Sequence, residues 1–206
     1  MSRYVGEETL SALNIVYPIP SIIIAVSIML ATGGSAIIAK NMGEGKGGEA
    51  KEKFSFIVSV GGIFGVVFLI LGVLFIDPLI LLLGATPELY ANCYDYLFIL
   101  IISVSMAVFQ MLFQNFFVTA GKPNLGLALA VLGGVSNIIL DYVFIKMCRC
   151  GVSGAALATA IGYSVPGIFG LIYFIMNRKG ALYLVKPVFR IKVLIRGCMR
   201  FFGNGK

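Results

Sequence analysis

Histidine is absent from this 206-residue sequence, and charged residues are scarce. Without histidine, the chain can form no histidine-ligated metal site and has no imidazole general base. Asp, Glu, Lys and Arg make up 12% of the residues, about half the share found in soluble domains. No nucleophile–base pair is visible, and the glycines at 43–48 do not have the spacing of a phosphate-binding loop. We therefore expect no enzyme, no metal site and no cofactor.

Long charge-free runs dominate what is present, and hydrophobic residues make up 59% of the sequence. Each run reaches or exceeds the roughly 18–20 residues that a helix needs to cross a bilayer core. None shows the ten-residue alternation of a membrane-spanning strand. We predict an all-α integral membrane protein without a separate soluble domain. Its five transmembrane helices are expected at about 14–39, 54–76, 96–118, 123–145 and 152–176.

The basic residues predict how the chain is oriented. If the connections between spans alternate sides, only Arg3, Lys146 and Arg149 fall on one side, and every other basic residue falls on the opposite side. The positive-inside rule places the larger group in the cytoplasm. We therefore expect a multi-pass plasma-membrane protein with its N-terminus outside and its C-terminus cytoplasmic. The same distribution argues against a nucleic-acid partner, despite the net charge of +7.

The segment 178–206 is basic and amphipathic. Within it, Arg190, Lys192, Arg196 and Arg200 alternate with apolar side chains. This pattern is typical of a helix on the inner membrane surface, attracted by anionic lipid. A solvated cytoplasmic linker is the alternative.

The run 126–145 contains the strongest candidate for function. Its small and polar residues are spaced three or four apart and therefore share one helix face: Gly126, Ala130, Gly133, Asn137 and Asp141. The small residues admit a neighbouring helix, and the polar ones need partners there. A carboxylate in a membrane span costs roughly 2.5–3.5 kcal/mol at the centre, which makes Asp141 a functional candidate. The alternative is that Asp141 pairs with Lys146 or reaches water at the outer surface.

The other polar residues in the spans could have a structural role instead of a functional one. Gln110, Gln114 and Asn115 could hydrogen-bond to neighbouring helices. Thr159 could bond back to its own helix. Cys93 shares the predicted outer side with Cys148 and Cys150, which leaves both a disulfide and free thiols open.

Several motifs together resemble one family. Asn137-Ile-Ile-Leu-Asp141-Tyr-Val-Phe-Ile145 and Gly151-Val-Ser-Gly-Ala-Ala-Leu-Ala-Thr159 are similar to the fifth and sixth helices of multidrug and toxic compound extrusion (MATE) transporters. Segment 31–43 is similar to the end of their second helix, and Thr119-Ala-Gly-Lys-Pro123 to the turn after the fourth. The resemblance covers about residues 4–196.

The resemblance implies two pseudo-symmetric six-helix lobes that export organic cations in exchange for protons or sodium ions. Residues 1–177 would then be a partial N-terminal lobe holding its second to sixth helices, followed by the basic segment 178–206. The expected partners are the lipid bilayer, small organic cations, and a first helix with a second six-helix lobe or a separately encoded half. The only ion expected to bind is the transported proton or sodium.

The resemblance also implies a cation site. Asp141 matches the family's acidic residue that takes up the proton or sodium, Asn137 matches the amide beside it, and Thr159 matches the hydroxyl facing them. Gln114 or Asn115 lies near a polar position of the family's fourth helix. The family's other acidic partner belongs to its first helix, which this chain lacks.

Two other functions remain open from the sequence. The chain could be a non-transporting structural half, or a remnant, that needs a partner lobe. It could also move lipid-linked saccharide, as related flippases do. That cargo would favour a more cationic cavity, whereas the predicted spans contain no Lys or Arg.

Overall fold

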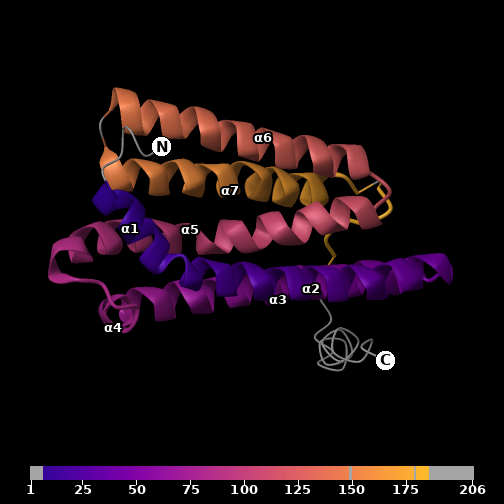
Figure 1. Ribbon diagram of the computed structural model, residues 1–206. Coiled ribbons are helices and arrows are strands. Elements are labelled where there is room, and N and C mark those ends of the chain that lie inside the picture. The colour runs from indigo at the N-terminus through magenta and orange to yellow at the C-terminus, as the bar shows by residue number, and fades with distance from the viewer. Residues whose placement is uncertain (1–6, 149, 179, 186–206) are drawn as a thin grey trace, which may run out of the picture.

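A computed structural model of the protein describes residues 7–148, 150–178 and 180–185, and every regular element in this part is a helix (Figure 1). In chain order the elements are α1 Glu7–Val16, α2 Pro18–Gly43, α3 Gly47–Leu74, α4 Ile76–Leu82, α5 Pro87–Thr119, α6 Pro123–Asp141, the π-helix η1 Tyr142–Met147, and α7 Gly151–Met176.

Five helical segments are long and apolar enough to cross a membrane: α2, α3, α5, α6 with η1, and α7. The predicted all-α fold with five membrane-spanning helices is therefore confirmed, and the protein is a multi-pass membrane protein. Its orientation stays a prediction. We call the end of the bundle that holds the α2–α3 turn the inner end, following the charge rule, and the opposite end the outer end.

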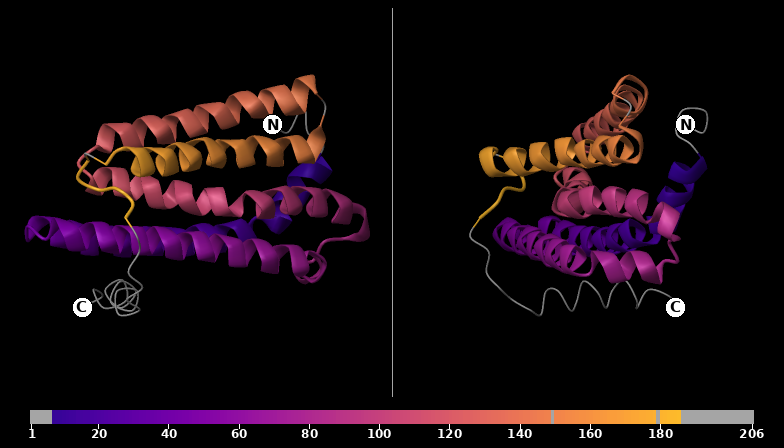
Figure 2. Two further views of the ribbon diagram at one scale, coloured as in Figure 1. Left: turned by 180° about the vertical axis from the view of Figure 1, so that it is seen from behind. Right: turned by 90° about the vertical axis from the view of Figure 1, so that its left-hand side faces the viewer.

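Helix α5 is the middle layer of the bundle. It is the longest helix, with 33 residues, and it packs against α2, α3, α6 and α7. Figure 1 and the two views of Figure 2 show α6 and α7 on one side of α5, and α2 and α3 on the other. The two outer layers are therefore joined largely through their packing on α5.

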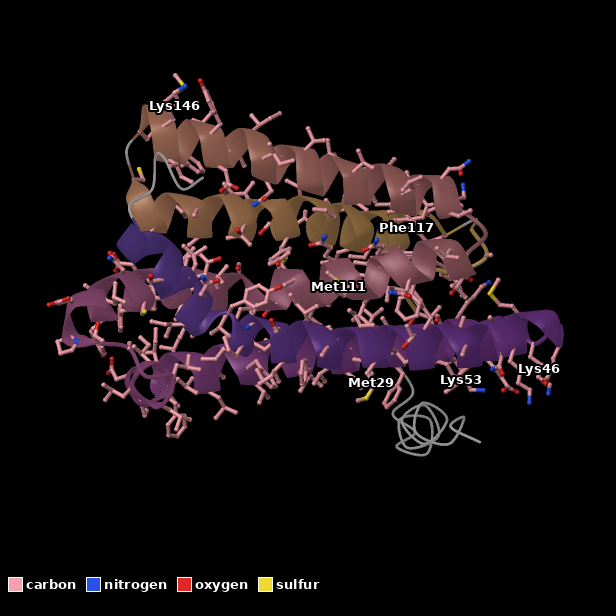
Figure 3. All side chains as sticks on the ribbon, in the orientation of Figure 1. Met29, Lys46, Lys53, Met111, Phe117 and Lys146 are labelled. Carbon is pink, nitrogen blue, oxygen red and sulfur yellow. The ribbon has the colours of Figure 1, made fainter. Side chains whose placement is uncertain are left out.

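The two ends of the bundle differ in their charged side chains. Figure 3 shows Lys46 and Lys53 at the inner end, whereas Lys146 lies at the outer end. At the inner end the α2–α3 turn is short, and Lys46 lies 2.8 Å from the Glu44 carboxylate. This hydrogen bond and the positive charge lower the pKa of Glu44.

A cluster of aromatic rings fills the inner half of the bundle. Phe54 of α3 is fully buried, and its ring centroid lies 5.0 Å from that of Phe116 on α5 and 4.9 Å from that of Phe174 on α7. Phe117 lies 4.9 Å from Phe174. Edge-on and tilted rings at these distances attract one another beyond their burial. The cluster therefore binds three helices of different layers together at the inner end.

The helices begin at other residues than the first two predicted spans. The first span is expected from residue 14, whereas helix α2 begins at Pro18 and residues 7–16 form the separate helix α1. Proline suits the first turn of α2 because that turn needs no amide donor there. The second span is expected from residue 54, whereas helix α3 begins at Gly47 and includes the charged residues before Phe54.

The fourth predicted span also differs from a single α-helix. The α-helical part ends at Asp141, and residues 142–147 form a π-helix. The remaining two long helices begin and end close to expectation, apart from an earlier start of α5 at Pro87. The predicted division at residue 177 stays a prediction, and the amphipathic pattern at 190–200 lies outside the described residues.

The aromatic cluster predicts a large effect of Phe54→Ala. The variant leaves a cavity among three helices, so we expect its free energy of unfolding to fall by about 3–5 kcal/mol. Thermal unfolding in detergent measures the loss. Phe75→Ala is the matched control, because Phe75 is 53% exposed; equal losses for both variants would contradict the assigned role of the cluster.

Candidate functional site

Helices α6 and α7 approach each other closely at two glycines. A Cβ atom added to Gly133 of α6 would lie 2.9 Å from the carbonyl oxygen of Gly162 on α7. A Cβ atom added to Gly162 would lie 3.2 Å from the Cβ of Asn137. Small residues thus allow backbone-to-backbone contact, and this contact presses Asn137 against α7.

Asn137 and Thr159 meet at this crossing. The Asn137 amide nitrogen donates a hydrogen bond of 3.4 Å to the Thr159 hydroxyl. The same hydroxyl donates to the backbone carbonyl of Ala155 at 3.0 Å. Thr159 therefore makes both contacts considered from the sequence, the bond to its own helix and the contact with Asn137.

Asp141 ends α6, one helical turn beyond Asn137. Its Oδ1 atom is buried and has no hydrogen-bond partner among the described residues. Lys146, the alternative partner, donates a hydrogen bond of 2.9 Å to the Tyr142 hydroxyl and lies 4.7 Å from the centre of that ring. A buried carboxyl oxygen without a donor is costly when it is ionised, which distinguishes Asp141 from an ordinary surface acid.

A π-helix begins directly after Asp141. It covers Tyr142–Met147, and the Cys148 amide donates to the Val143 carbonyl at 3.0 Å, five residues earlier. Single π-helical turns occur frequently at functional sites. The wider turn changes which face the following residues share with Asp141, and Phe144 comes to lie against Gly154 of α7.

Tyr96 is a site neighbour that sequence reasoning missed. It lies on α5 and is 7% exposed. Its side chain lies near Thr159, Asp141 and Tyr163. Tyr96 thus brings the middle layer to the site. Nothing in the sequence relates Tyr96 to Asp141, because the two residues approach only when α5 packs against α6 and α7.

Gln114 and Asn115 lie elsewhere on α5. Gln114 is exposed, and its backbone oxygen approaches Gly126 at the start of α6. Gly126 is three helical turns from Asn137, about 16 Å along the axis. The Asn115 amide donates to the carbonyl of Met111 at 2.9 Å. The structure therefore brings together Asp141, Asn137 and Thr159, with Tyr96, but it places the two amides of α5 far towards the inner end.

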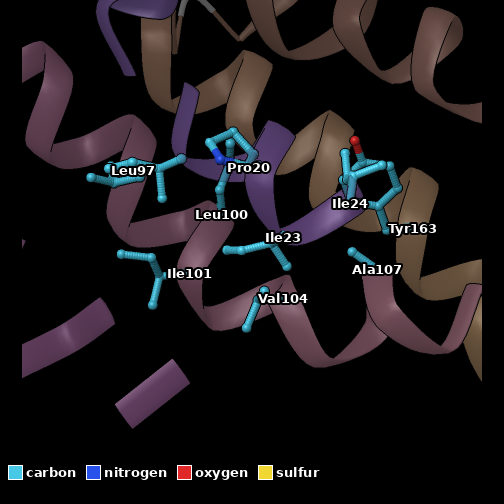
Figure 4. Close-up of a pocket in the computed structure, with 10 residues that line it drawn as sticks. Pro20, Ile23, Ile24, Leu97, Leu100, Ile101, Val104, Ala107 and Tyr163 are labelled. Atoms are coloured by element: carbon cyan, nitrogen blue, oxygen red, sulfur yellow. The ribbon is translucent and has the colours of Figure 1, made fainter. Parts of the chain in front are cut away.

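An apolar pocket lies close to the polar cluster. Side chains of α2 and α5 line it, among them Ile23, Leu100 and Val104, and Tyr163 of α7 closes one side (Figure 4). Tyr163 also lies near Tyr96. The pocket therefore adjoins the polar cluster through two tyrosines and offers an apolar surface beside it.

The cysteines do not add a metal centre. Within residues 7–148, 150–178 and 180–185, no group of three or more Cys, Asp or Glu could hold a metal ion. Cys93 is buried and free, and Cys148 and Cys150 are exposed and free. Of the two options from the sequence, the structure has free thiols. Cys198 lies outside the described residues.

Five helices long and apolar enough to cross a membrane, with a carboxyl, an amide and a hydroxyl on α6 and α7, define a multi-pass helical membrane protein. The particular family follows from comparison with known proteins. Residues 1–143 match the MatE family model, and the chain belongs to that family. The resemblance found in the motifs is therefore confirmed.

Individual relatives are multidrug export proteins. The chain is 28% identical over 191 residues to the multidrug export protein MepA of Staphylococcus saprophyticus, an alignment that covers 90% of this chain and 42% of the relative. MepA of Staphylococcus aureus is 28% identical over 169 residues, covering 82% of this chain and 37% of the relative. The chain thus spans about two fifths of the length of the curated relatives it matches.

Solved structures of similar fold include both conformations of a transporter. An inward-facing multidrug resistance MATE family transporter matches with a TM-score of 0.87 and 26% identity, covering 94% of this chain and 44% of that one. An outward-facing conformation of such a transporter matches with the same TM-score and identity, covering 95% and 44%. The described helices therefore have an arrangement that both conformations share.

The glycine crossing predicts that Gly133→Ala separates α6 from α7. The added methyl group meets backbone and Pro166 at 2.9 Å, so we expect a loss of about 1–3 kcal/mol in the free energy of unfolding. Thermal unfolding in detergent measures it. The adjacent variant Gly134→Ala meets no atom within 4 Å and serves as the control; a similar loss in both would contradict the close crossing.

Proposed function

We propose that the protein is part of a cation-coupled multidrug efflux transporter, with Asp141 as the residue that binds the coupling proton or sodium ion. The observation that carries the proposal is the buried Oδ1 of Asp141 without a hydrogen-bond donor, one turn from Asn137 and close to Tyr96. The names of the relatives support the multidrug part, since they are multidrug export proteins.

The surroundings of Asp141 suit a proton or a hard cation. An ionised carboxylate away from water needs a compensating partner, and a proton or Na⁺ supplies one. The other groups nearby are the amide of Asn137 and the hydroxyls of Thr159 and Tyr96. Oxygen atoms of these kinds are the ligands that hard cations prefer. Asn137 and Thr159 would therefore complete the coordination that Asp141 begins.

Coupling then follows from differential affinity. A cation that binds Asp141 more tightly in one conformation than in the other shifts the equilibrium towards the first conformation by that difference in affinity. Asp141 lies at the junction of α6 and η1, where the backbone changes from α to π geometry. A change of charge at this junction is well placed to alter the backbone where α6 continues into η1.

The cargo is proposed to be a small organic cation, as the multidrug export proteins among the relatives suggest. The described membrane-spanning helices contain no Lys or Arg deep in the bundle, and none lines the apolar pocket beside Tyr163, which disfavours the phosphate-bearing headgroup of a lipid-linked saccharide.

A second proposal concerns assembly. Because the chain spans about two fifths of the relatives it matches, we propose that a further six-helix lobe completes the transport path. Co-purification of the tagged chain with a partner of multi-pass helical type tests it, and a chain that transports as an isolated monomer in vesicles would contradict it.

Asp141→Asn tests the coupling role. The variant keeps the shape of the side chain but can neither take up a proton nor balance a cation, so gradient-driven efflux of a fluorescent organic cation should fall at least about tenfold, the loss expected when more than about 1.4 kcal/mol of coupling disappears. Efflux is measured in vesicles that contain the protein with any partner lobe it requires. Asp95→Asn, at an exposed acid of α5, is the control. Undiminished gradient-driven efflux in the Asp141 variant would rule the proposal out.

A further inference from the structure

The chain after α7 turns back across the inner end of the bundle. Figures 1 and 2 show it leaving the end of α7, passing α5 and reaching the α2–α3 layer. The Leu184 amide donates to the carbonyl of Phe174 on α7 at 3.0 Å. Leu182 is 1% exposed and belongs to the same buried cluster as Phe54 and Phe174. This segment is therefore packed into the bundle and anchored to α7.

The same segment is also anchored to α3, 130 residues away in the sequence. The Val185 amide donates to the buried Ser55 hydroxyl at 2.7 Å. One turn earlier on α3, the Lys51 ammonium lies 4.2 Å from the centre of the Tyr183 ring. Ser55 and Lys51 are four residues apart and so share one helix face. Together they form the surface of α3 that the segment contacts, with one hydrogen bond and one cation–π contact.

We propose that residues 181–185 are a clasp that locks α7 to α3 at the inner end, so that the five spanning helices move as one body. The two anchors lie on opposite sides of α5, which otherwise carries most contacts between the outer layers. Besides the ring contact of Phe54 with Phe174, the clasp adds a hydrogen-bonded connection between α7 and α3, through the Phe174 carbonyl on one side and the Ser55 hydroxyl on the other. The clasp does not depend on which cation or cargo the protein carries.

The role of a rigid connector agrees with the structural comparisons. This chain matches an inward-facing and an outward-facing transporter equally well, so the packing among these helices is common to both conformations. A set of helices that keeps the same packing in both conformations is stabilised when its layers are joined at both ends. At the outer end α1 packs against α5 and α2, and at the inner end the clasp has the corresponding position.

Ser55→Ala tests the polar anchor by hydrogen exchange of the purified protein in detergent. Loss of the acceptor should speed exchange of the peptide at 182–185 about 2- to 10-fold, the range expected for one hydrogen bond. Exchange in the last turn of α7, residues 173–177, should rise with it. Ser55→Thr retains the hydroxyl and should retain protection. Ser59→Ala is the matched control, since the Ser59 hydroxyl donates to the Ser55 carbonyl of its own helix.

Lys51→Met tests the cationic anchor independently. It keeps the length of the side chain but removes the charge over Tyr183, and it should speed exchange at 182–185 and at 173–177. Lys53→Met is its control, because Lys53 pairs with Glu49 at 3.3 Å. The proposal is overturned if exchange at 182–185 is unchanged in both anchor variants. It is equally overturned if that segment loosens while 173–177 stays fully protected, because the segment would then be tethered without locking α7.

Discussion

The close crossing of α6 and α7 is the contact on which the candidate site depends. Gly133 and Gly162 bring the two backbones together, and only at that separation can the Asn137 amide reach the Thr159 hydroxyl. The absence of two side chains thus creates a polar contact. Asp141 follows one turn later on the same face, so its burial is a consequence of the same packing. The polar groups are therefore brought together by the close packing of the two helices and not by attraction between charges.

The inner and outer halves of the bundle differ in their aromatic and ionisable groups. In the inner half, the rings of Phe54, Phe116 and Phe174 link three helices. The outer half has a buried apolar core of its own, and there the Oδ1 atom of Asp141 has no hydrogen-bond donor among the described residues. A densely packed cluster resists rearrangement because any gap loses many contacts, whereas an incompletely bonded carboxyl responds to a proton or an ion. The candidate site therefore places a group that responds to charge among packed helices, and α5 joins it to the aromatic cluster through Tyr96 and Phe116.

The sequence predicts the five spans well because lipid excludes charge so strongly that charge-free runs mark them. It predicts helix ends poorly, since charge marks where lipid stops and not where helix stops: Lys51 and Lys53 lie outside the apolar run but inside α3. For the site, spacing on α6 placed Asn137 and Asp141 on one face. The contact with Thr159 was expected from family resemblance. Tyr96 was missed because its proximity comes from packing between helices, and the π-helix because no residue in 142–147 marks a wider turn.

The position of the carboxyl at the end of α6 bears on how a bound ion could act. Transporters in opposite conformations share the arrangement of these helices, so an ion at Asp141 need not unpack the bundle. A local change is sufficient if it occurs where the backbone is least constrained. The π-helix at 142–147 has no buried residue, unlike α7 beside it, and it begins at the residue after Asp141. Neutralising that carboxyl would therefore first change the backbone where α6 continues into η1. The aromatic inner half would keep its packing and move as a rigid unit.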